Sequence, residues 1–477
     1  MIKKLYVPFA LLISLMMASF SFAQEEGVSR LEFAKKVLDM TKYELSSESA
    51  SMFGDIKNPS DIPYANTASS YGLIKGYENN FFPDSKLTKE QSIVILVRAM
   101  GEEPFAQQMS QDKIESLLKF TDGSTISSWA RPAVAYLVEN GLLTATGALE
   151  PQSIASSSYA DGLYSKCKTF FDSKLSKEGY SAALLLDKAS KSIEKYNTYK
   201  FKGDMDMDTT VTAPDENNKI VTENTKMKMV QEGIFEKPEK IYVKSTVTMI
   251  PMNEKQKEEL GDMLEQSSEL YFDGQRYLMK TSMEDSWLEL DITPLIKQLQ
   301  SMTGSSSMNS QGITREQLEL YGMYAQYGAD ETVDGRDCYI VNVELDSATF
   351  NKLMKQIMDQ TIDFYKNSNL QQLDQEQSEM SQQEIEEFKT TLSAMFSNMN
   401  VNVSYKFIVD KDTLEYRSFD MEQKMDMSIG DIKTSTTASG SYEYYDFNKQ
   451  LEFPQIKESE IKTLEQISQS STPEQAN

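Results

Sequence analysis

The side chains of this chain that could take part in chemistry are carboxylates, two cysteines and 27 methionines. Histidine is absent from all 477 residues, so neither a Ser-His-Asp or Cys-His nucleophile nor a histidine-ligated metal site can be built. Two carboxylates could act as general acid and base, but 73 acidic residues single out no pair. The residue types therefore favour a binding protein over an enzyme.

The cysteines and a set of alternating aspartates are the remaining candidates for metal binding. Cys167 and Cys338 lie far apart in the sequence, and two cysteines without histidine make a poor metal site. We expect two separately buried thiols, with a disulfide as the alternative. Asp204, Asp206 and Asp208 could in principle bind Ca²⁺, but without a glycine-bearing loop we interpret them as a solvated strand face. No metal or cofactor is predicted.

The charge of the chain excludes another class of partner. With 48 basic against 73 acidic residues the formal net charge is −25, whereas nucleic-acid binding requires lysine and arginine to neutralise phosphates. Residues 24–180 contain 21 acidic and 16 basic side chains, and residues 181–477 contain 52 and 30. We therefore expect no nucleic-acid partner and an acidic C-terminal part.

The first residues have the pattern of an export signal. A basic start at residues 1–4 is followed by an apolar run over residues 5–20 and by Ser21-Phe22-Ala23, a small-x-small cleavage site. The apolar run is shorter than the ~20 residues that span a membrane. We expect cleavage after Ala23 rather than a retained anchor. The mature chain would then be extracellular and have no transmembrane segment.

Two stretches of the N-terminal third repeat the same motifs. Each contains a Phe-x-Asp triplet, then an aromatic residue followed by alanine, then a glycine followed by apolar residues. These motifs stand at residues 53–55, 64–65 and 72–74 in one stretch and at 120–122, 129–130 and 141–143 in the other. A third copy shows only its second half, at residues 28–34, which match residues 87–93.

Each repeat is predicted to form two helices joined by a turn. The first helix covers about residues 63–71, where apolar residues recur at helical spacing, and Gly72 and Gly76 suit a helix end followed by a turn. Thr88 is the expected N-cap of the second helix, which has apolar residues over 93–100. One unit buries too little apolar surface alone, so we expect neighbouring copies to stack.

This set of motifs resembles the S-layer homology (SLH) repeat over about residues 28–170. The family implies an all-α, three-lobed module that holds extracellular proteins on the bacterial cell wall. Its ligand is an acidic, often pyruvylated, secondary cell-wall polysaccharide. Carried over by position, the resemblance implies six polymer-contacting candidates: Arg30, Asp55, Gly76, Lys89, Trp129 and Gly141.

The repeats also depart from the family pattern. The first lacks its front half, Lys89 stands where arginine is usual, and residues 153–156 read Ser-Ile-Ala-Ser instead of Thr-Arg-Ala-Glu. A purely structural remnant is therefore the alternative to wall binding. The candidates have structural alternatives too: Trp129 in the core, Asp55 as a cap, and Gly76 for its backbone angles.

From about residue 184 the hydrophobic period changes to two. Phe201, Gly203, Met205 and Met207 alternate with charged residues, and Asp-Gly pairs at 273–274 and 334–335 are strong hairpin signals. We expect antiparallel strands that pack one face against the core and expose the other face to solvent. Further strands are predicted at 270–281, 287–290, 338–345, 401–409, 414–429, 432–439 and 442–447, and helices at 184–196, 254–265, 293–302, 314–327, 348–365 and 382–399.

This layout resembles the LolA/LppX-type lipoprotein-carrier fold. The resemblance is carried by residues 199–203, 271–274 and 407–413 and by Trp287. It implies a lipid or other hydrophobic molecule held between sheet and helices. Methionines concentrated in this region fit an adaptable apolar surface, although plain sheet core is the alternative.

The predicted fold class is α+β, with all-α SLH-type repeats followed by a curved antiparallel β-sheet with packed helices. We expect a signal peptide at 1–23, repeats over 28–175 (28–45, 52–101 and 119–170), a LolA/LppX-like domain at 184–456 and a polar tail at 457–477. We predict a secreted, non-enzymatic, wall-associated surface protein whose SLH module tethers an acidic domain that binds a hydrophobic or lipid-like molecule or a partner. The alternatives are a structural envelope protein without ligand and, less favoured, a carboxylate-based hydrolase.

Overall fold

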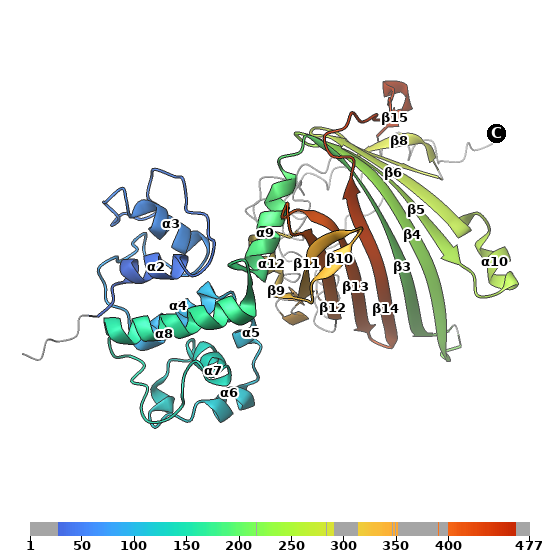
Figure 1. Ribbon diagram of the computed structural model, residues 1–477. Helices are drawn as coiled ribbons and strands as arrows, with labels where there is room; N and C mark the ends of the chain where they lie inside the picture. Colours follow the sequence, from blue (N-terminus) through green and yellow to red (C-terminus); the bar gives the residue numbers. More distant parts are fainter. Residues whose placement is uncertain are drawn as a thin grey trace, which may run out of the picture. The chain divides into compact units, whose positions relative to one another are not determined.

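The computed structural model describes residues 27–215, 217–282, 284–290, 313–345, 347–348, 350–351, 390 and 399–463. The chain divides into two compact units, Met1–Ser181 and Ala182–Asn477, which we describe separately. The first unit is mainly helical and the second is built on a large, mostly antiparallel sheet (Figure 1), so the predicted α+β class is confirmed. The expected signal segment, the helix at 293–302 and most of those at 348–365 and 382–399 lie outside the described residues.

Several helices of the first unit begin at a serine or threonine N-cap. Ser29, Thr88 and Ser156 are the N-caps of α2, α4 and α8, and each hydroxyl accepts a backbone N–H of the first turn. Ser29 and Thr88 also form capping boxes, which confirms Thr88 as the helix start. The helices are α2 (Arg30–Leu38), α3 (Ile62–Ser70), α4 (Lys89–Ala99), α5 (Glu103–Gln107), α6 (Gln111–Leu117), α7 (Arg131–Glu139) and α8 (Ser157–Phe170).

The residues just before these three N-caps meet in a closed ring of backbone hydrogen bonds. The N–H of Val28 donates to the carbonyl of Ala155 (3.0 Å), that of Ala155 to Leu87 (2.8 Å), and that of Leu87 to Val28 (3.1 Å). The segment that contains Val28 therefore supplies the third member of this ring. A ring of this kind satisfies each segment's polar backbone inside a shared apolar core.

The second unit contains one sheet in the order β10-β11-β12-β13-β14-β3-β4-β5-β6-β7-β8-β15, with β9 also paired to β11. Neighbours are antiparallel except for β8 and β15. The strands are β3 (Thr198–Pro214), β4 (Ile220–Glu236), β5 (Lys240–Ile250), β6 (Glu265–Asp273), β7 (Tyr277–Thr281), β8 (Glu284–Leu290), β9 (Met323–Tyr327), β10 (Glu331–Val333), β11 (Arg336–Leu345), β12 (Asn400–Asp410), β13 (Tyr416–Ile429), β14 (Ile432–Tyr445) and β15 (Ile461–Lys462).

Three predicted segments differ from the structure. The helix expected at 314–327 ends early, because Gly322 takes a left-handed φ of 66° after α12 (Arg315–Tyr321) and the chain continues as β9. The strands expected at 432–439 and 442–447 are one strand, β14. The segment expected as a polar tail from 457 includes β15, which pairs with Trp287 and Leu288 of β8.

Strand register aligns methionines in rows on one face of the sheet. Met207 pairs with Met227, which in turn pairs with Met249, and Met205 pairs with Met229. All five are half-buried. Because successive residues point to opposite faces, the aspartates that alternate with them along β3 lie on the other face, as predicted.

Glycines within these strands allow close approach of neighbouring groups. A Cβ at Gly203 would lie 2.4 Å from the ring of Tyr442, and one at Gly440 only 2.2 Å from the carbonyl oxygen of Asp204. Gly440 has no positive φ and pairs with Met205 inside the ladder. It therefore marks close backbone approach rather than the end of a strand.

Both cysteines are buried and free, as the sequence suggested. Burial raises the pKa of the Cys167 thiol to about 12, so this thiol is unreactive near neutral pH. Among the described residues, no helix combines the length and the apolar character that a membrane span requires.

Candidate functional site

The first unit contains two clusters built on the same plan. In what we call the first cluster, the carboxylate of Asp55 accepts the backbone N–H groups of Phe81 (2.8 Å) and Phe82 (2.6 Å). Arg30, the first residue of α2, donates from Nε to the carbonyl of Phe81 (2.9 Å) and from Nη2 to that of Lys75 (3.0 Å). The structure thus brings two of the sequence candidates, Arg30 and Asp55, onto one segment of backbone.

Electrostatics keep the Arg30 guanidinium available as a cation. Burial lowers its pKa from the usual value, and the nearby charge of Asp55 opposes that shift. Arginine remains protonated throughout the ordinary pH range. The guanidinium also lies 5.5 Å from the centre of the Phe81 ring. In the part of the chain that the structure describes, Arg30 forms no ion pair with a carboxylate, although its Nη1 could still donate to an anion.

Gly76 has a packing role beside this cluster. A Cβ there would lie 2.3 Å from the ring of Phe53 and 2.8 Å from the carbonyl oxygen of Asn80. The ring of Phe53 in turn packs edge-on against Phe81 at 5.3 Å. Gly76 does not have a positive φ, so the alternative that it serves special backbone angles is wrong; the requirement is space.

The second cluster is formed by Lys89, Asp122, Leu149 and Glu150. The carboxylate of Asp122 accepts the N–H groups of Leu149 (2.8 Å) and Glu150 (2.7 Å). Lys89, the first residue of α4, donates to the carbonyl of Leu149 (3.2 Å) and to Oε2 of Glu150 (3.0 Å). Burial alone would raise the pKa of Asp122, but these N–H bonds and the charge of Lys89 lower it.

Sequence reasoning did not select Asp122 or Glu150 as site residues. The signal for Asp122 was present, because it occupies the same place in its Phe-x-Asp triplet as Asp55. Glu150 carried no such signal. Its place follows only from the equivalence with Phe82, since each residue has a left-handed φ, 53° and 59°.

Trp129 and Gly141 are not members of either hydrogen-bonded cluster. Trp129 is 49% exposed in a turn before α7, so its alternative as a core residue is wrong. Glu90 accepts bonds from the N–H (3.1 Å) and hydroxyl (2.8 Å) of Ser127, which fixes that turn beside α4. Gly141 has a φ of 70° just past α7, where the next N–H, of Leu142, returns to the carbonyl of Leu137 (2.8 Å). This is a glycine C-cap.

The segments that form these clusters also match a known protein family. Residues 53–91 and 119–149 match the S-layer homology domain. The matched segments contain five of the six candidates, while Arg30 precedes the first match and Glu150 lies just past the second. No curated protein matches the chain.

Solved structures similar to the chain include the lipoprotein LppX of Mycobacterium tuberculosis, at 10% identity over 57% of this chain and 96% of that one, with a TM-score of 0.24. LprF of Mycobacterium bovis is 8% identical over 59% and 98%, also with a TM-score of 0.24. An undecaheme cytochrome from the S-layer of Carboxydothermus ferrireducens is 10% identical over 35% and 22%, with a TM-score of 0.21. The expected LppX-type resemblance is therefore found, but TM-scores this low identify no ligand.

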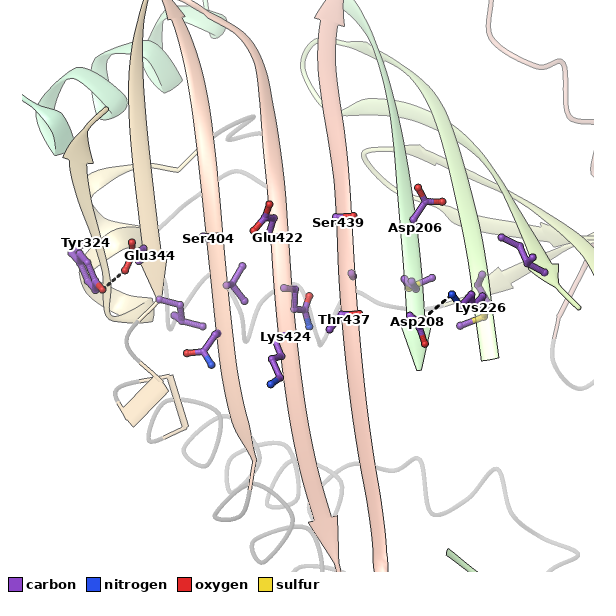
Figure 2. A pocket seen from close by; sticks show the side chains of 18 residues that line it. Asp206, Asp208, Lys226, Tyr324, Glu344, Ser404, Glu422, Lys424, Thr437 and Ser439 are labelled. Atoms are coloured by element: carbon purple, nitrogen blue, oxygen red, sulfur yellow. Dashed lines mark hydrogen bonds and ion pairs between the residues drawn. The ribbon is translucent and has the colours of Figure 1, made fainter. Parts of the chain in front are cut away.

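The second unit has a hollow of about 790 Å³ along its sheet (Figure 2). Its lining includes successive residues of single strands, such as 206–208 and 437–439, so the strand backbones form its floor. Met207, Met227 and Val403 also border the hollow, although strand alternation points their side chains to the face opposite Asp206 and Asp208. The charged members are Asp206, Asp208, Lys226, Glu344, Glu422 and Lys424.

The charged groups of the hollow are partly paired with one another. Lys226 Nζ lies 3.3 Å from Asp208, and the hydroxyl of Tyr324 donates to Glu344 (2.5 Å), as the dashed lines of Figure 2 show. The hollow is therefore amphipathic rather than the wholly apolar cavity that a simple lipid carrier would have. In the described residues no group of three or more side chains is arranged to hold a metal ion.

Proposed function

We propose that this chain is a cell-surface protein that its first unit attaches to an acidic cell-wall polysaccharide. The match to the S-layer homology domain supports surface anchoring in general. The first cluster carries the finer proposal, because Arg30 is a cation fixed by two backbone carbonyls and the aromatic Phe82 of the same cluster is 41% exposed. An arginine fork matches a carboxylate, and aromatic rings pack against sugar rings. The polymer would be secondary cell-wall polysaccharide, and an export signal at 1–23 would place the chain outside the cell.

Replacing Arg30 by alanine tests this proposal. We expect the full chain to be retained on purified cell-wall sacculi that contain the secondary polymer and to be lost from sacculi stripped of it. Arg30→Ala should weaken retention about 30-fold, because hydrogen bonds to charged groups contribute about 1.5–3 kcal/mol each. Arg30→Lys should recover only part of the binding, since lysine keeps the charge without the planar fork.

Arg131→Ala is the matched control for this experiment. Arg131 also donates to a backbone carbonyl, that of Gly123 (3.0 Å), and is paired with Glu115 (2.8 Å). Its loss should leave retention unchanged. Equal retention of wild type and Arg30→Ala, with both folded by circular dichroism, would show that the first cluster does not bind the polymer.

We further infer that the second unit binds an amphiphilic, lipid-like molecule, held by a curved sheet and its helices. The aligned methionines of β3, β4 and β5 supply polarisable, adaptable apolar surface. The lysines and carboxylates of the hollow extend from the opposite face of the same strands, so this part of the sheet offers both the charged and the apolar groups that a ligand with a polar head and an apolar body requires. The function is binding rather than catalysis.

Native mass spectrometry of the full chain tests the second unit. We expect a mass excess that disappears on extraction with organic solvent. Met227→Lys should reduce the occupied fraction at least tenfold, because it places a charge in the row of aligned methionines that borders the lining of the hollow. Met263→Lys is the control, since Met263 is 49% exposed and lies outside that lining. A clean mass in wild type would count against a carried ligand.

A further inference from the structure

The two clusters of the first unit share three backbone contacts and differ in the charge of one exposed side chain. An aspartate clamps two successive N–H groups, and a basic residue at the start of a helix binds the carbonyl between them. The second clamped residue has a left-handed φ in both clusters. That residue is Phe82 in the first cluster and Glu150 in the second.

Glu150 uses its position to neutralise Lys89. Its Oε2 lies 3.0 Å from Lys89 Nζ, and the Glu150 side chain is 65% exposed while that of Lys89 is only 18% exposed. The other neighbours of the ammonium are the carbonyl of Leu149 and the ring of Tyr159, 5.3 Å away. Lys89 is therefore covered, and the group that covers it is a carboxylate on the solvent side.

The charges of the two clusters differ as a result. The first has one carboxylate, Asp55, and one guanidinium, Arg30. The second has two carboxylates, Asp122 and Glu150, facing the single ammonium of Lys89. An anion that approaches the second cluster meets a net negative charge and has to displace a tethered competitor.

The geometry points to Glu150 as an internal substitute for the ligand's carboxylate, so that only the first cluster binds acidic sugar. Glu150 thereby sets the number of polymer contacts per chain to one. This inference rests on the proposed wall-polymer binding and deepens it. Since an exposed ion pair contributes little to folding stability, Glu150 neutralises Lys89 without stabilising the fold greatly.

Exchange of the two differing residues provides the test. Isothermal titration of the full chain with a 4,6-O-pyruvylated methyl glycoside should give one site. Glu150→Phe and Glu150→Gln should each add a second site with an affinity within about tenfold of the first. Phe82→Glu should lower the affinity of the first site at least tenfold, because the new carboxylate would capture Arg30. Glu115→Gln, which removes another exposed carboxylate, paired with Arg131, should leave one site.

The outcomes separate this inference from the proposal on which it rests. One site in wild type and still one site in both folded Glu150 variants would overturn the role of Glu150 and leave wall binding intact. The double variant Arg30→Ala with Glu150→Gln should keep one site, now at Lys89; loss of all binding would also contradict the inference. Absence of a site in wild type, together with no polymer-dependent retention on sacculi, would overturn the proposed function itself.

Discussion

Replacing Asp410 by alanine should lower the free energy of unfolding of the second unit by about 3 kcal/mol at pH 7, because it removes a buried carboxylate that two arginines share. The Asp410 side chain is 2% exposed and lies 3.1 Å from Arg336 and 3.0 Å from Arg417. Its other oxygen accepts the N–H groups of Asp412 and Thr413, both at 3.0 Å. One carboxylate thus closes the turn after β12 and holds β11 and β13 to it.

The pH dependence of this effect has a definite sign. Burial would raise the pKa of Asp410, but the N–H of Thr413 and the two arginines outweigh it and lower the pKa well below the usual value. A carboxylate whose pKa is lowered on folding stabilises the native state above its unfolded pKa of about 3.9. The stabilisation is lost as the pH falls below that value. The difference between wild type and Asp410→Ala should therefore be full at pH 7 and shrink below about pH 4.

Urea unfolding followed by the intensity of the far-ultraviolet strand signal measures the effect at several pH values. Asp426→Ala is a suitable control. Asp426 also lies on the sheet, but its side chain is 43% exposed and 3.6 Å from Lys424, so its loss should cost less than about 1 kcal/mol. A loss as small for Asp410→Ala, or one that does not change between pH 7 and pH 3, would contradict the assigned role.

The sequence predicts most elements of this fold because the evidence for them is local. Alternation along β3 and the Asp-Gly pair at 334–335 give strand faces and a hairpin directly, and Thr88 gives a helix start. Gly440 shows where local evidence misleads. A glycine inside a strand suggests a break, yet here it is required by the carbonyl of Asp204 on β3, which is distant in sequence.

The residues of the candidate site are likewise predictable only where the evidence for them is local in the sequence. Asp55 and Asp122 could be identified from a repeated triplet, although only the structure shows that both clamp backbone N–H groups. Arg30 and Asp55 come together through a ring of three segments that spans more than a hundred residues, which no spacing rule predicts. Glu150 became relevant only when its left-handed backbone and its bond to Lys89 matched it with Phe82.

Replacing Glu102 by glutamine should stabilise the first unit above neutral pH, in contrast to the usual effect of removing a charge. The carboxylate of Glu102 lies just before α5 and accepts the hydroxyl of Tyr136 on α7 (2.6 Å). Burial raises the pKa of Glu102 to about 7, and the bond from Tyr136 opposes that shift only in part. The folded chain therefore holds a proton that the unfolded chain releases near pH 4.5.

A carboxylate whose pKa is raised on folding gives its full stability below the unfolded pKa and loses it as the pH rises through the folded value. From a pKa of 4.5 to one of about 7, at 1.36 kcal/mol for each unit, the loss amounts to about 3 kcal/mol. Glutamine is neutral at every pH and its amide oxygen can still accept the Tyr136 hydroxyl. Glu102→Gln should thus match wild type near pH 4.5 and exceed it by about 3 kcal/mol at pH 8.

Amide hydrogen exchange in α5 and α7 reports this difference within the full chain, because exchange is measured at individual amides and reflects local opening. Protection of these helices should fall in wild type between pH 5 and about pH 7 and level off above it, after correction for intrinsic exchange, and stay level throughout in Glu102→Gln. Glu139→Gln is the control: it removes a carboxylate of the same helix α7 that is 37% exposed and paired with Lys113 at 2.5 Å. The same decline in wild type and Glu102→Gln would mean that another group releases the proton. A level wild-type profile would mean that Glu102 is already ionised in the folded state. The hydrogen bond from Tyr136 would then stabilise the carboxylate enough to offset its burial between α5 and α7.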